Sequence, residues 1–508
     1  MSSNHVDTIV VGAGSAGAVI SARLSENSAH QVLLVEAGPD YPDLEVLPHD
    51  LVDGTRNSMR AHDWGYRHRP TRGQMLFDFP RGKVVGGSSA VNTCIALRGQ
   101  PEDYDEWAER GLHEWSFERC LPAFKRLETD LDFENEWHGK SGPIPIRRHT
   151  PDELTLWQAA FLEACRELGF RRSSDHNDPT QTGAGPHAMN KVKGVRMSAA
   201  RCYLTPEVRR RGNLRILPKT LVRRVIFEKR RAVGVEVERN GAVEVLRGGR
   251  VVLSAGALVS PAVLLRSGIG PRRELERLGV DLVFDLPAVG ARLLDHPGAV
   301  IVLVPKWGVS KVEHPLIQTV LRYTSEDSRQ PNDMQLQPGS FMFLPGMSTP
   351  LVTLMCCVGK PRGVGKLILP SADPHVRLRI DSCLLEDDAD RARAVEALEL
   401  AWLCARTRPL SELARFLWPN ERILSDRSEL DRFILRATGS GYHPCGTLPM
   451  GEERDPDAAL DGFGRVRGVD GLVVADASIM PTIPSSNTNL PTLMIGERFG
   501  EWLRDGVI

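Results

Sequence analysis

DTIVVGAGSAG, residues 7–17, decides the fold, because it combines the pattern of a buried strand with a glycine-rich turn and the start of a helix. The β-branched run 8–11 lacks the alternation of a half-exposed strand, which is typical of a parallel strand buried on both faces. A helical pattern follows over 15–27, and a second strand, QVLLVE, over 31–36. This order predicts the first strand–helix–strand unit of a parallel sheet.

The turn has the spacing G-x-G-x-x-G, which is typical of dinucleotide-binding sites. Gly12 permits the tight turn, Gly14 lets a pyrophosphate approach the backbone, and Gly17 lets the helix pack closely on the strand. The helix N-terminus, at Ser15-Ala16, then faces the phosphates. Glu36 ends the second strand, where a carboxylate can accept both ribose hydroxyls of an adenosine. A glycine-rich turn can also occur by chance, but these elements in register favour a dinucleotide site, without distinguishing FAD from NAD.

The rest of the chain shows two kinds of strand pattern. Strand patterns like those at the start of the chain recur at 213–218, 221–227, 232–238, 250–254 and 471–475, with helices from 261–267 and from about 491. Irregular strands between about 299 and 380 indicate one largely antiparallel sheet: AVIVLVPKW, MQLQPGSFMFL, LVTLMCCVG, GKLILPS and VRLRID. Other helices are predicted over 151–169, 386–407 and 428–437, and the segment 40–100 is rich in loops.

Composition and charge exclude several classes of partner. The 508 residues suggest about three domains at roughly 150 residues each. Lys plus Arg is 64 and Asp plus Glu is 65, so no global field would attract nucleic acid or an acidic membrane surface. We find neither a signal-peptide pattern nor a run of about 18 apolar residues, and therefore predict no membrane segment. The nine cysteines form no Cys-x-x-Cys pair, which argues against zinc and favours reduced thiols in a cytoplasmic protein.

Four further motifs resemble the signatures of one enzyme family. They are GKVVGGSSAVN at 82–92, GALVSP to SGIG at 256–270, YHPCGT at 442–447, and DAS to NTN at 476–489. Their order and sequence resemble the glucose–methanol–choline (GMC) oxidoreductases from residue 7 to about 503. Within that family the chain looks most similar to the choline dehydrogenase and the bacterial aryl-alcohol or hydroxymethylfurfural oxidase branch.

The resemblance implies FAD as the cofactor and gives each motif a place. The backbone of Gly86-Gly87-Ser88 would run along the flavin, and Asn92 would hold the pyrophosphate or the flavin edge. Val222 would meet the adenine through its backbone, and Ala255-Gly256 would lie near the ribose. Asp476 would lie near the pyrophosphate and ribitol, whereas Trp64 would either stack near the adenine or be structural. The remaining residues expected at the cofactor are Ala37, Arg81, Val84, Ala477 and Thr488.

Two positions depart from the family pattern. Some choline oxidases attach FAD covalently through a histidine of the first signature, at a position that aligns here with Val91. Valine cannot be alkylated by the flavin, so we expect noncovalent FAD. Arg292 stands where the family usually has Asn, which puts the local contacts in doubt but not the fold.

The expected chemistry needs a base for the hydroxyl proton and a hydride acceptor. His443, in a turn with Pro444 and Gly446, matches the family's catalytic position, and histidine titrates near neutral pH. Asn487 matches a position that is His or Asn in the family, and its amide can bond the alcohol oxygen. Tyr442 is expected either to wall the substrate site or to be a core aromatic. Among the other histidines, His296 is expected to be structural or to contact the flavin; His62, His68 and His138 are expected to be solvated in loops.

These residues predict oxidation of a primary alcohol to an aldehyde, with hydride transfer to flavin N5 and O2 as the acceptor. A dehydrogenase that uses a quinone or another carrier would keep the same residues. An FAD-containing lyase and a light-driven decarboxylase are the more distant alternatives. The apolar stretch 341–344 (Phe-Met-Phe-Leu) suggests an aromatic or aliphatic substrate, and no acidic-aromatic cage for a quaternary ammonium is evident.

We therefore expect an α/β and α+β protein, with a Rossmann-like FAD-binding domain and an inserted substrate domain built on a largely antiparallel sheet. The FAD-binding domain would comprise three separate parts of the chain: 1–150, 201–298 and 441–508. Residues 151–200 would supply a substrate-domain helix and a cap segment, and 299–440 the main substrate-binding domain.

Overall fold

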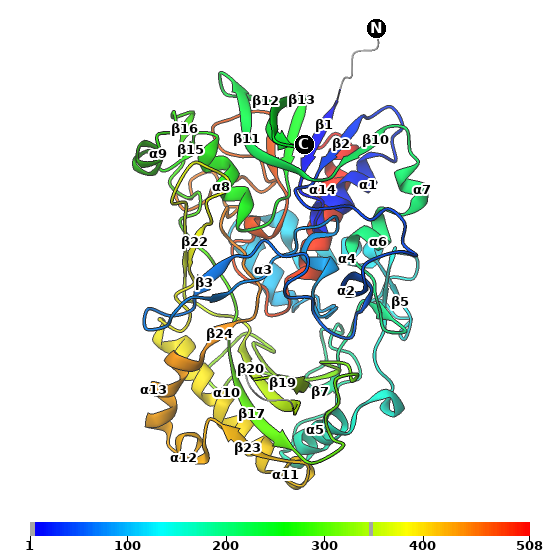
Figure 1. The fold of residues 1–508 in the computed structure, drawn as a ribbon, viewed down its shortest axis with the longest axis vertical. Helices are drawn as coiled ribbons and strands as arrows, with labels where there is room; N and C mark the ends of the chain where they lie inside the picture. The colour runs from blue at the N-terminus through cyan, green and yellow to red at the C-terminus, as the bar shows by residue number, and fades with distance from the viewer. Residues whose placement is uncertain (1–5, 345–348) are drawn as a thin grey trace.

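The computed structural model describes residues 6–344 and 349–508. Its first layer is a five-stranded parallel sheet in the order β10-β2-β1-β14-β25 (Figure 1). The strands are β1 (Thr8–Val11), β2 (Val32–Val35), β10 (Leu214–Leu217), β14 (Arg250–Leu253) and β25 (Leu472–Val474). All five were predicted within one or two residues. β1, β2, β14 and β25 are buried and largely apolar, as is typical of parallel strands, whereas β10 is interrupted by the exposed Arg215.

The start and the end of the chain share this layer. Helix α1 (Ser15–Leu24) packs against α14 (Asn489–Arg504), which Figure 1 shows as neighbouring blue and red helices. A three-stranded antiparallel sheet adjoins the layer, formed by β11 (Thr220–Glu228), β12 (Arg231–Arg239) and β13 (Ala242–Arg247). Strand β13 was not predicted. Its residues are almost all exposed, so it lacks the apolar face that marked the other strands.

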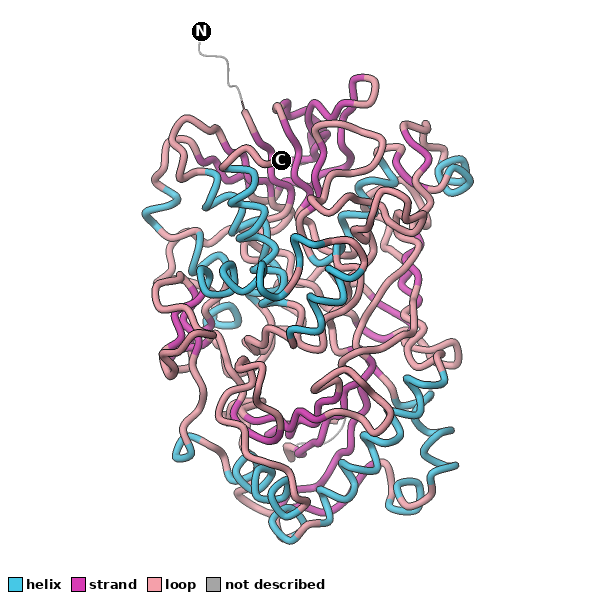
Figure 2. Tube along the Cα trace, turned by 180° about the vertical axis from the view of Figure 1, so that it is seen from behind, coloured by secondary structure: helices cyan, strands magenta, loops and turns pink. Residues whose placement is uncertain are grey.

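A second, seven-stranded antiparallel sheet forms the lower half of the molecule in Figure 1. Its order is β23-β17-β20-β19-β18-β7, and β24 also pairs with β17. The strands are β7 (Gly183–Pro186), β17 (Pro297–Pro305), β18 (Thr319–Tyr323), β19 (Met334–Met342), β20 (Leu351–Val358), β23 (Ala414–Trp418) and β24 (Gly439–Ser440). The predicted antiparallel sheet is thus present, and Figure 2 shows helices along its outer side.

Two of the strands predicted for that sheet belong elsewhere. β21 (Lys366–Ile368) and β22 (Arg379–Asp381) pair with β3 (Arg67–Arg69) and β4 (Phe77–Asp78) in a separate four-stranded sheet. The loop-rich segment 40–100 therefore contributes two short strands. Strand β22 runs parallel to β3, a pairing between distant segments that no local pattern reveals.

The helix predicted over 151–169 is shorter than expected. Residues Pro151–Glu153 form a 3-10 turn, and α5 spans only Leu156–Glu167. Thr150 caps that turn together with Glu153, and the chain becomes extended at Leu154 before the helix begins. The predicted helices 386–407 and 428–437 correspond to α10 (Asp388–Arg406) and α13 (Arg427–Ala437), and the helix from 261–267 to α8 (Val259–Arg266).

The remaining elements are short. The helices are α2 (His49–Val52), α3 (Pro101–Glu109), α4 (Phe117–Leu127), α6 (Ala199–Tyr203), α7 (Pro206–Arg209), α9 (Arg272–Leu278), α11 (Arg408–Ser411) and α12 (Glu421–Leu424). The strand pairs are β5 (Glu128–Asp130) with β6 (Ile144–Ile146), β8 (Lys191–Val192) with β9 (Val195–Arg196), and β15 (Ile269–Gly270) with β16 (Phe284–Asp285). Among the described helices, none combines the length and apolar composition needed to cross a bilayer.

Two apolar cores correspond to the two halves. One surrounds the parallel sheet together with α1, α4, α8 and α14, and the other lies between the seven-stranded sheet and helices α5, α10 and α13. The five-part domain division of the sequence stays a prediction.

Candidate active site

A single cavity collects most of the predicted site residues. It encloses about 1680 Å³ not filled by protein atoms, part of it open to solvent. The predicted residues that line it are Gly12, Gly14, Ser15, Ala16, Glu36, Ala37, Trp64, Arg81, Gly87, Ser88, Asn92, Val222, Ala255, Gly256, Tyr442, His443, Asp476, Ala477, Asn487 and Thr488. The lining residues near 12–16, 36–37, 255–256 and 476–477 directly follow β1, β2, β14 and β25, at the carboxyl ends of the parallel strands, where open α/β sheets bind their ligands. The others come from the segment 40–100, from β11, and from the loops that follow β24 and precede α14.

Three predicted residues lie behind the cavity wall. Gly17 packs within α1, where a Cβ would lie 1.9 Å from the carbonyl oxygen of Gly12. The N–H of Gly86 donates to the carbonyl of Ala13 at 2.7 Å, joining the two glycine-rich segments. Val84 is buried against Leu51 and neighbouring apolar residues. These three shape the wall and do not line the cavity.

Glu36 is held at the dinucleotide end of the cavity. One carboxylate oxygen accepts the N–H of Ala13 at 2.9 Å and the other the N–H of Gly38 at 2.8 Å. Burial raises the pKa of Glu36 to about 6, although these hydrogen bonds oppose the rise. Each oxygen keeps a lone pair for a further donor, as a ribose hydroxyl would require.

The cavity wall has the unsatisfied groups that a dinucleotide would complete. The first turn of α1 has no side-chain cap and no acidic residue, so its N–H groups can meet a phosphate. Asn489 accepts a hydrogen bond from the hydroxyl of Ser15 at 2.8 Å, but its Nδ2 is buried without a partner in the described structure. The Asp476 carboxylate accepts the N–H of Gly256 at 2.8 Å and fixes that edge of the cavity. The residues present therefore fit FAD.

Sequence reasoning missed several lining residues. Asn489 lies within the last motif but was given no role, and Thr93 and Ile95 lie within three residues after the first signature, so extending that signature would have found the latter two. Asn57, Ser58 and Met59 come from the loop-rich segment and line the cavity without any sequence signal. In contrast, residues 341–344, expected at the substrate, do not line this cavity. Phe341 instead packs under the guanidinium of Arg56, and Phe343 is exposed.

His443 and Asn487 contact each other in the wall of the same cavity. The Nε2 atom of His443 lies 3.0 Å from Nδ2 of Asn487, while Oδ1 of Asn487 is buried without a partner in the described structure. Burial, followed by the nearby His296 and Arg81, lowers the pKa of His443 well below its usual value. The ring is therefore neutral at physiological pH and able to accept a proton.

The backbone around His443 is tightly fixed. The Asp295 carboxylate accepts the N–H of His443 at 2.8 Å and the N–H of His296 at 2.9 Å. Tyr442 adopts a positive φ of 63°, uncommon for a non-glycine residue, and its carbonyl accepts a hydrogen bond from Arg81. Tyr442 lines the cavity with 38% of its surface exposed, which excludes the alternative of a core aromatic.

The other histidine expectations need correction. His138 and His68 are 1% and 2% exposed and His62 is half-buried, so none of the three is a solvated loop residue. The His68 ring contacts the hydroxyl of Ser382 at 2.8 Å, and the His62 ring contacts Asp50 at 2.8 Å. His68 lies in β3 beside Ser382, and His138 contacts Asp175, so the burial of both depends on segments that the local sequence does not show.

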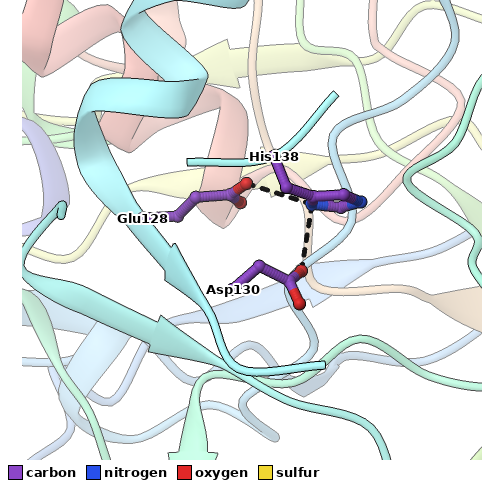
Figure 3. Close-up of side chains that lie close together, drawn as sticks. All are labelled: Glu128, Asp130 and His138. Carbon is purple, nitrogen blue, oxygen red and sulfur yellow. Dashed lines mark hydrogen bonds and ion pairs between the residues drawn. The ribbon is translucent and has the colours of Figure 1, made fainter. Parts of the chain in front are cut away.

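A buried cluster of Glu128, Asp130 and His138 has the composition of a metal site. Figure 3 shows both carboxylates directed at the Nδ1 atom of His138, at distances of 3.2 and 3.0 Å. The other ring nitrogen, Nε2, lies 2.7 Å from Asp175. Since carboxylates only accept, both ring nitrogens donate and the ring is an imidazolium.

Two arginines complete the charge balance of this cluster. Arg98 pairs with Glu128, and Arg148 pairs with Asp130 at 2.9 Å and with Asp175 at 2.5 Å. Three cations thus face three carboxylates, and a divalent metal ion bound in place of the His138 proton would leave one positive charge uncompensated in a buried site. The cluster is better explained as a structural ion network.

Comparison with known proteins agrees with this geometry. The models of the GMC oxidoreductase family match residues 6–298 and 361–496. The chain is 33% identical to a 5-(hydroxymethyl)furfural oxidase of Methylovorus sp. (strain MP688), covering 99% of both chains. It is 30% identical to an oxygen-dependent choline dehydrogenase of Photobacterium profundum, covering 97% of this chain and 92% of that one.

A solved structure extends the agreement to three dimensions. Pyridoxine 4-oxidase from Mesorbium loti superposes with a TM-score of 0.91 at 32% identity, covering 98% of this chain and 99% of the other. The family models match most of the chain, and the relatives match it almost from end to end. The chain belongs to the GMC oxidoreductase family, and its cofactor is FAD.

Proposed function

We propose that this enzyme oxidises a primary alcohol to an aldehyde and passes the electrons to O2. The observation that carries the proposal is the pairing of a neutral His443 with the Asn487 amide at one end of the FAD cavity. When bound, FAD supplies the hydride acceptor, and the protein supplies position and charge.

Each of the two side chains has one task. His443 Nε2 accepts the hydroxyl proton, because it is the ring atom that faces the Asn487 amide within the cavity. The Nδ2 group of Asn487 donates to the alcohol oxygen and stabilises the negative charge that develops there as the proton leaves. An amide does not titrate in this range, so it does not compete for the proton.

Charge around the site favours a neutral substrate. Among the described residues that line the cavity, the carboxylates are Glu36 and Asp476, and both are hydrogen-bonded at the dinucleotide end. A quaternary ammonium near His443 would therefore meet no carboxylate from the cavity lining, and it would meet the Arg81 cation. Two relatives are named for 5-(hydroxymethyl)furfural and pyridoxine, both aromatic rings bearing hydroxymethyl groups. We propose an uncharged aromatic primary alcohol.

The choice of O2 is supported by the names of the relatives, which are oxidases or oxygen-dependent. A quinone or another carrier would use the same alcohol-binding residues. A lyase would leave the flavin oxidised throughout turnover.

Anaerobic mixing with a panel of alcohols tests the reaction. Aromatic primary alcohols are expected to bleach the flavin absorbance faster than aliphatic ones, and choline is expected to act slowly or not at all. Admission of air should restore the absorbance with one peroxide per aldehyde. Bleaching without reoxidation would reject O2 as acceptor, and the absence of bleaching by any alcohol would reject the oxidation itself.

A further inference from the structure

Two imidazole rings meet directly at the catalytic end of the cavity. The Nδ1 atom of His296 lies 2.9 Å from the Nδ1 atom of His443, and the ring planes stand at 77°. A hydrogen bond at this distance needs one nitrogen with a proton and one without. Which ring donates decides where the catalytic histidine carries its proton.

The contacts of the other nitrogen of His296, Nε2, show which ring donates in the hydrogen bond between the two Nδ1 atoms. Its Nε2 atom lies 2.9 Å from the carbonyl oxygen of Gly359 and 3.0 Å from that of Pro484. Carbonyl oxygens only accept, so Nε2 must carry the proton. His296 is 1% exposed, and burial lowers its pKa to about 4, so the neutral ring has no second proton for Nδ1.

The proton on the contact therefore belongs to His443. Its Nδ1–H donates to the lone pair on Nδ1 of His296, and its Nε2 is left with a lone pair toward the Asn487 amide. The donor at Asn487 Nδ2 agrees with this assignment, because an N–H group would face an acceptor. Each hydrogen bond in the chain from Gly359 to Asn487 then has one donor and one acceptor.

We propose that His296 is a positioning residue that holds His443 in the Nδ1–H tautomer, so that Nε2 is available as the base. The proposal rests on the function proposed above and adds the group that prepares its base. When Nε2 takes the hydroxyl proton, His443 becomes an imidazolium whose Nδ1–H remains hydrogen-bonded to His296. No other proton needs to move, and the neutral acceptor stabilises the new charge.

The surrounding structure is built for this contact. A Cβ on Gly441 would lie 3.1 Å from both the Cβ of His296 and the Nδ1 of His443, so only glycine lets the rings approach without displacement. The N–H of Gly441 donates to the carbonyl of His296 at 2.8 Å. Asp295 accepts hydrogen bonds from the backbone N–H groups of both histidines.

The charged groups near the two rings are few. The cations that act on these rings are Arg81 for His443 and Lys360 for His296. The carboxylates are Asp103, near His296, and Asp295, whose pKa burial raises to about 6.

Two amide substitutions, each of which replaces one ring nitrogen of His296, separate this role from a purely structural one. His296→Asn places an amide oxygen near the former Nδ1, so it keeps the acceptor for His443. His296→Gln places an amide nitrogen near the former Nε2, so it keeps the donor to Gly359 and Pro484 but loses the acceptor. If His296 only ties these carbonyls together, His296→Gln should be the milder change.

The proposal expects the opposite order in the FAD-loaded enzyme. Anaerobic flavin reduction by a good alcohol should fall by about 10- to 100-fold in His296→Gln, as for other residues that orient a reacting histidine, and only a few-fold in His296→Asn. Flavin absorbance and the unfolding temperature serve as controls for occupancy and folding. Equal losses in the two variants, or a larger loss in His296→Asn, overturn the proposal.

Imidazole nitrogen shifts give a readout that does not depend on turnover. With ¹⁵N-labelled histidine in the holoenzyme, wild-type His443 should show a protonated Nδ1 and an unprotonated Nε2 at neutral pH. His443→Gln identifies its signals. A proton on Nε2 overturns the inference even if the enzyme oxidises alcohols. The expected tautomer together with a flavin that no alcohol reduces would reject the proposed function and leave the tautomer assignment standing.

Discussion

At the residue scale, the proposed role of His443 as the base can be tested by removing its ring, whose Nε2 contacts the Asn487 amide. In His443→Ala the rate of anaerobic flavin reduction should fall by about 10²–10⁴, the usual range for general acid–base catalysis. FAD should stay bound, since the glycine-rich turn and Glu36, the predicted contacts of its dinucleotide part, are unchanged. Stopped-flow absorbance measures both quantities.

Asn487→Ala is the matched comparison. It removes a hydrogen bond and no proton acceptor, so the reduction rate should fall less than in His443→Ala.

The lowered pKa of His443 also predicts a reduction rate that is level at neutral pH. The rate should decrease as the pH falls through the pKa of His443, because the ring is then already protonated. A His443→Ala enzyme that reduces its flavin at the wild-type rate would refute the mechanism and leave the family assignment intact.

Glu36 is the residue predicted to bind the ribose of FAD. Glu36→Ala should weaken FAD binding by about 1.5–3 kcal/mol, because a ribose would lose a charged acceptor. The substitution also frees the N–H groups of Ala13 and Gly38, so Glu36→Gln, which keeps one acceptor, is the control for local folding. Flavin fluorescence during dilution measures the affinity, and an unchanged dissociation constant in Glu36→Ala would contradict the assignment.

At the element scale, the buried ion network joins β5 to two distant loops. Burial alone would lower the pKa of His138, but hydrogen bonds to Asp130, Asp175 and Glu128 outweigh it and raise the pKa to about 10. A raised pKa contributes stability that is complete below the unfolded value, about 6.5, and is lost as the pH rises through 10. Burial alone would raise the pKa of Asp130, but His138 and Arg148 outweigh it and lower that pKa to about 2, which gives the opposite limit on the acid side.

This network predicts a pH-dependent effect of His138→Gln. Leaving buried carboxylates without their cation should cost about 3–5 kcal/mol at pH 6. The difference from wild type should shrink toward pH 10, where His138 itself loses its proton. His375→Gln, at an exposed pair with Glu238, is the control and should change little at either pH. Thermal unfolding at pH 6 and pH 9.5 measures the difference, and an equal loss at both values would argue against a charged His138.

At the scale of the whole molecule, the cavity is assembled from segments near residues 12, 90, 255, 443 and 487. A ligand that contacts all of them binds only the folded chain. Saturating FAD at 100 times its dissociation constant should therefore stabilise the protein by about 2.7 kcal/mol and raise the unfolding midpoint of the apoprotein by a few degrees. An apoprotein with an unchanged midpoint after FAD addition would contradict this assembly.

Val91 leads to a prediction about whether FAD is attached covalently to the protein. It lines the cavity and packs against Leu51, Val84 and Ala90, and its side chain offers no nucleophile. Acid precipitation should therefore release intact FAD into the supernatant. Yellow colour that stays with the precipitated protein would show a covalent link.

The sequence by itself determined the parallel sheet and predicted His443 as the base. Strands β1, β2, β14 and β25 are continuous apolar runs, and the turn at 12–17 has a spacing set by local backbone geometry, so short segments carry both signals. The motif around His443 was recognised through its resemblance to a family, and its place in the cavity followed. Asn489 was overlooked because one residue of a motif shows nothing of the Ser15 hydroxyl, 474 positions away.

Only the tertiary structure decided how distant segments pair. Strand β22 pairs with β3, so β21 and β22 lie outside the large sheet to which they were predicted to belong. This pairing depends on long-range packing that local patterns do not encode. The same holds for His138, which looks like a loop residue until Asp130, Asp175 and the arginines surround it. The tautomer of His443 depends on carbonyls at Gly359 and Pro484, brought together only by folding. Side-chain type is local, whereas burial and protonation depend on neighbours that the fold supplies.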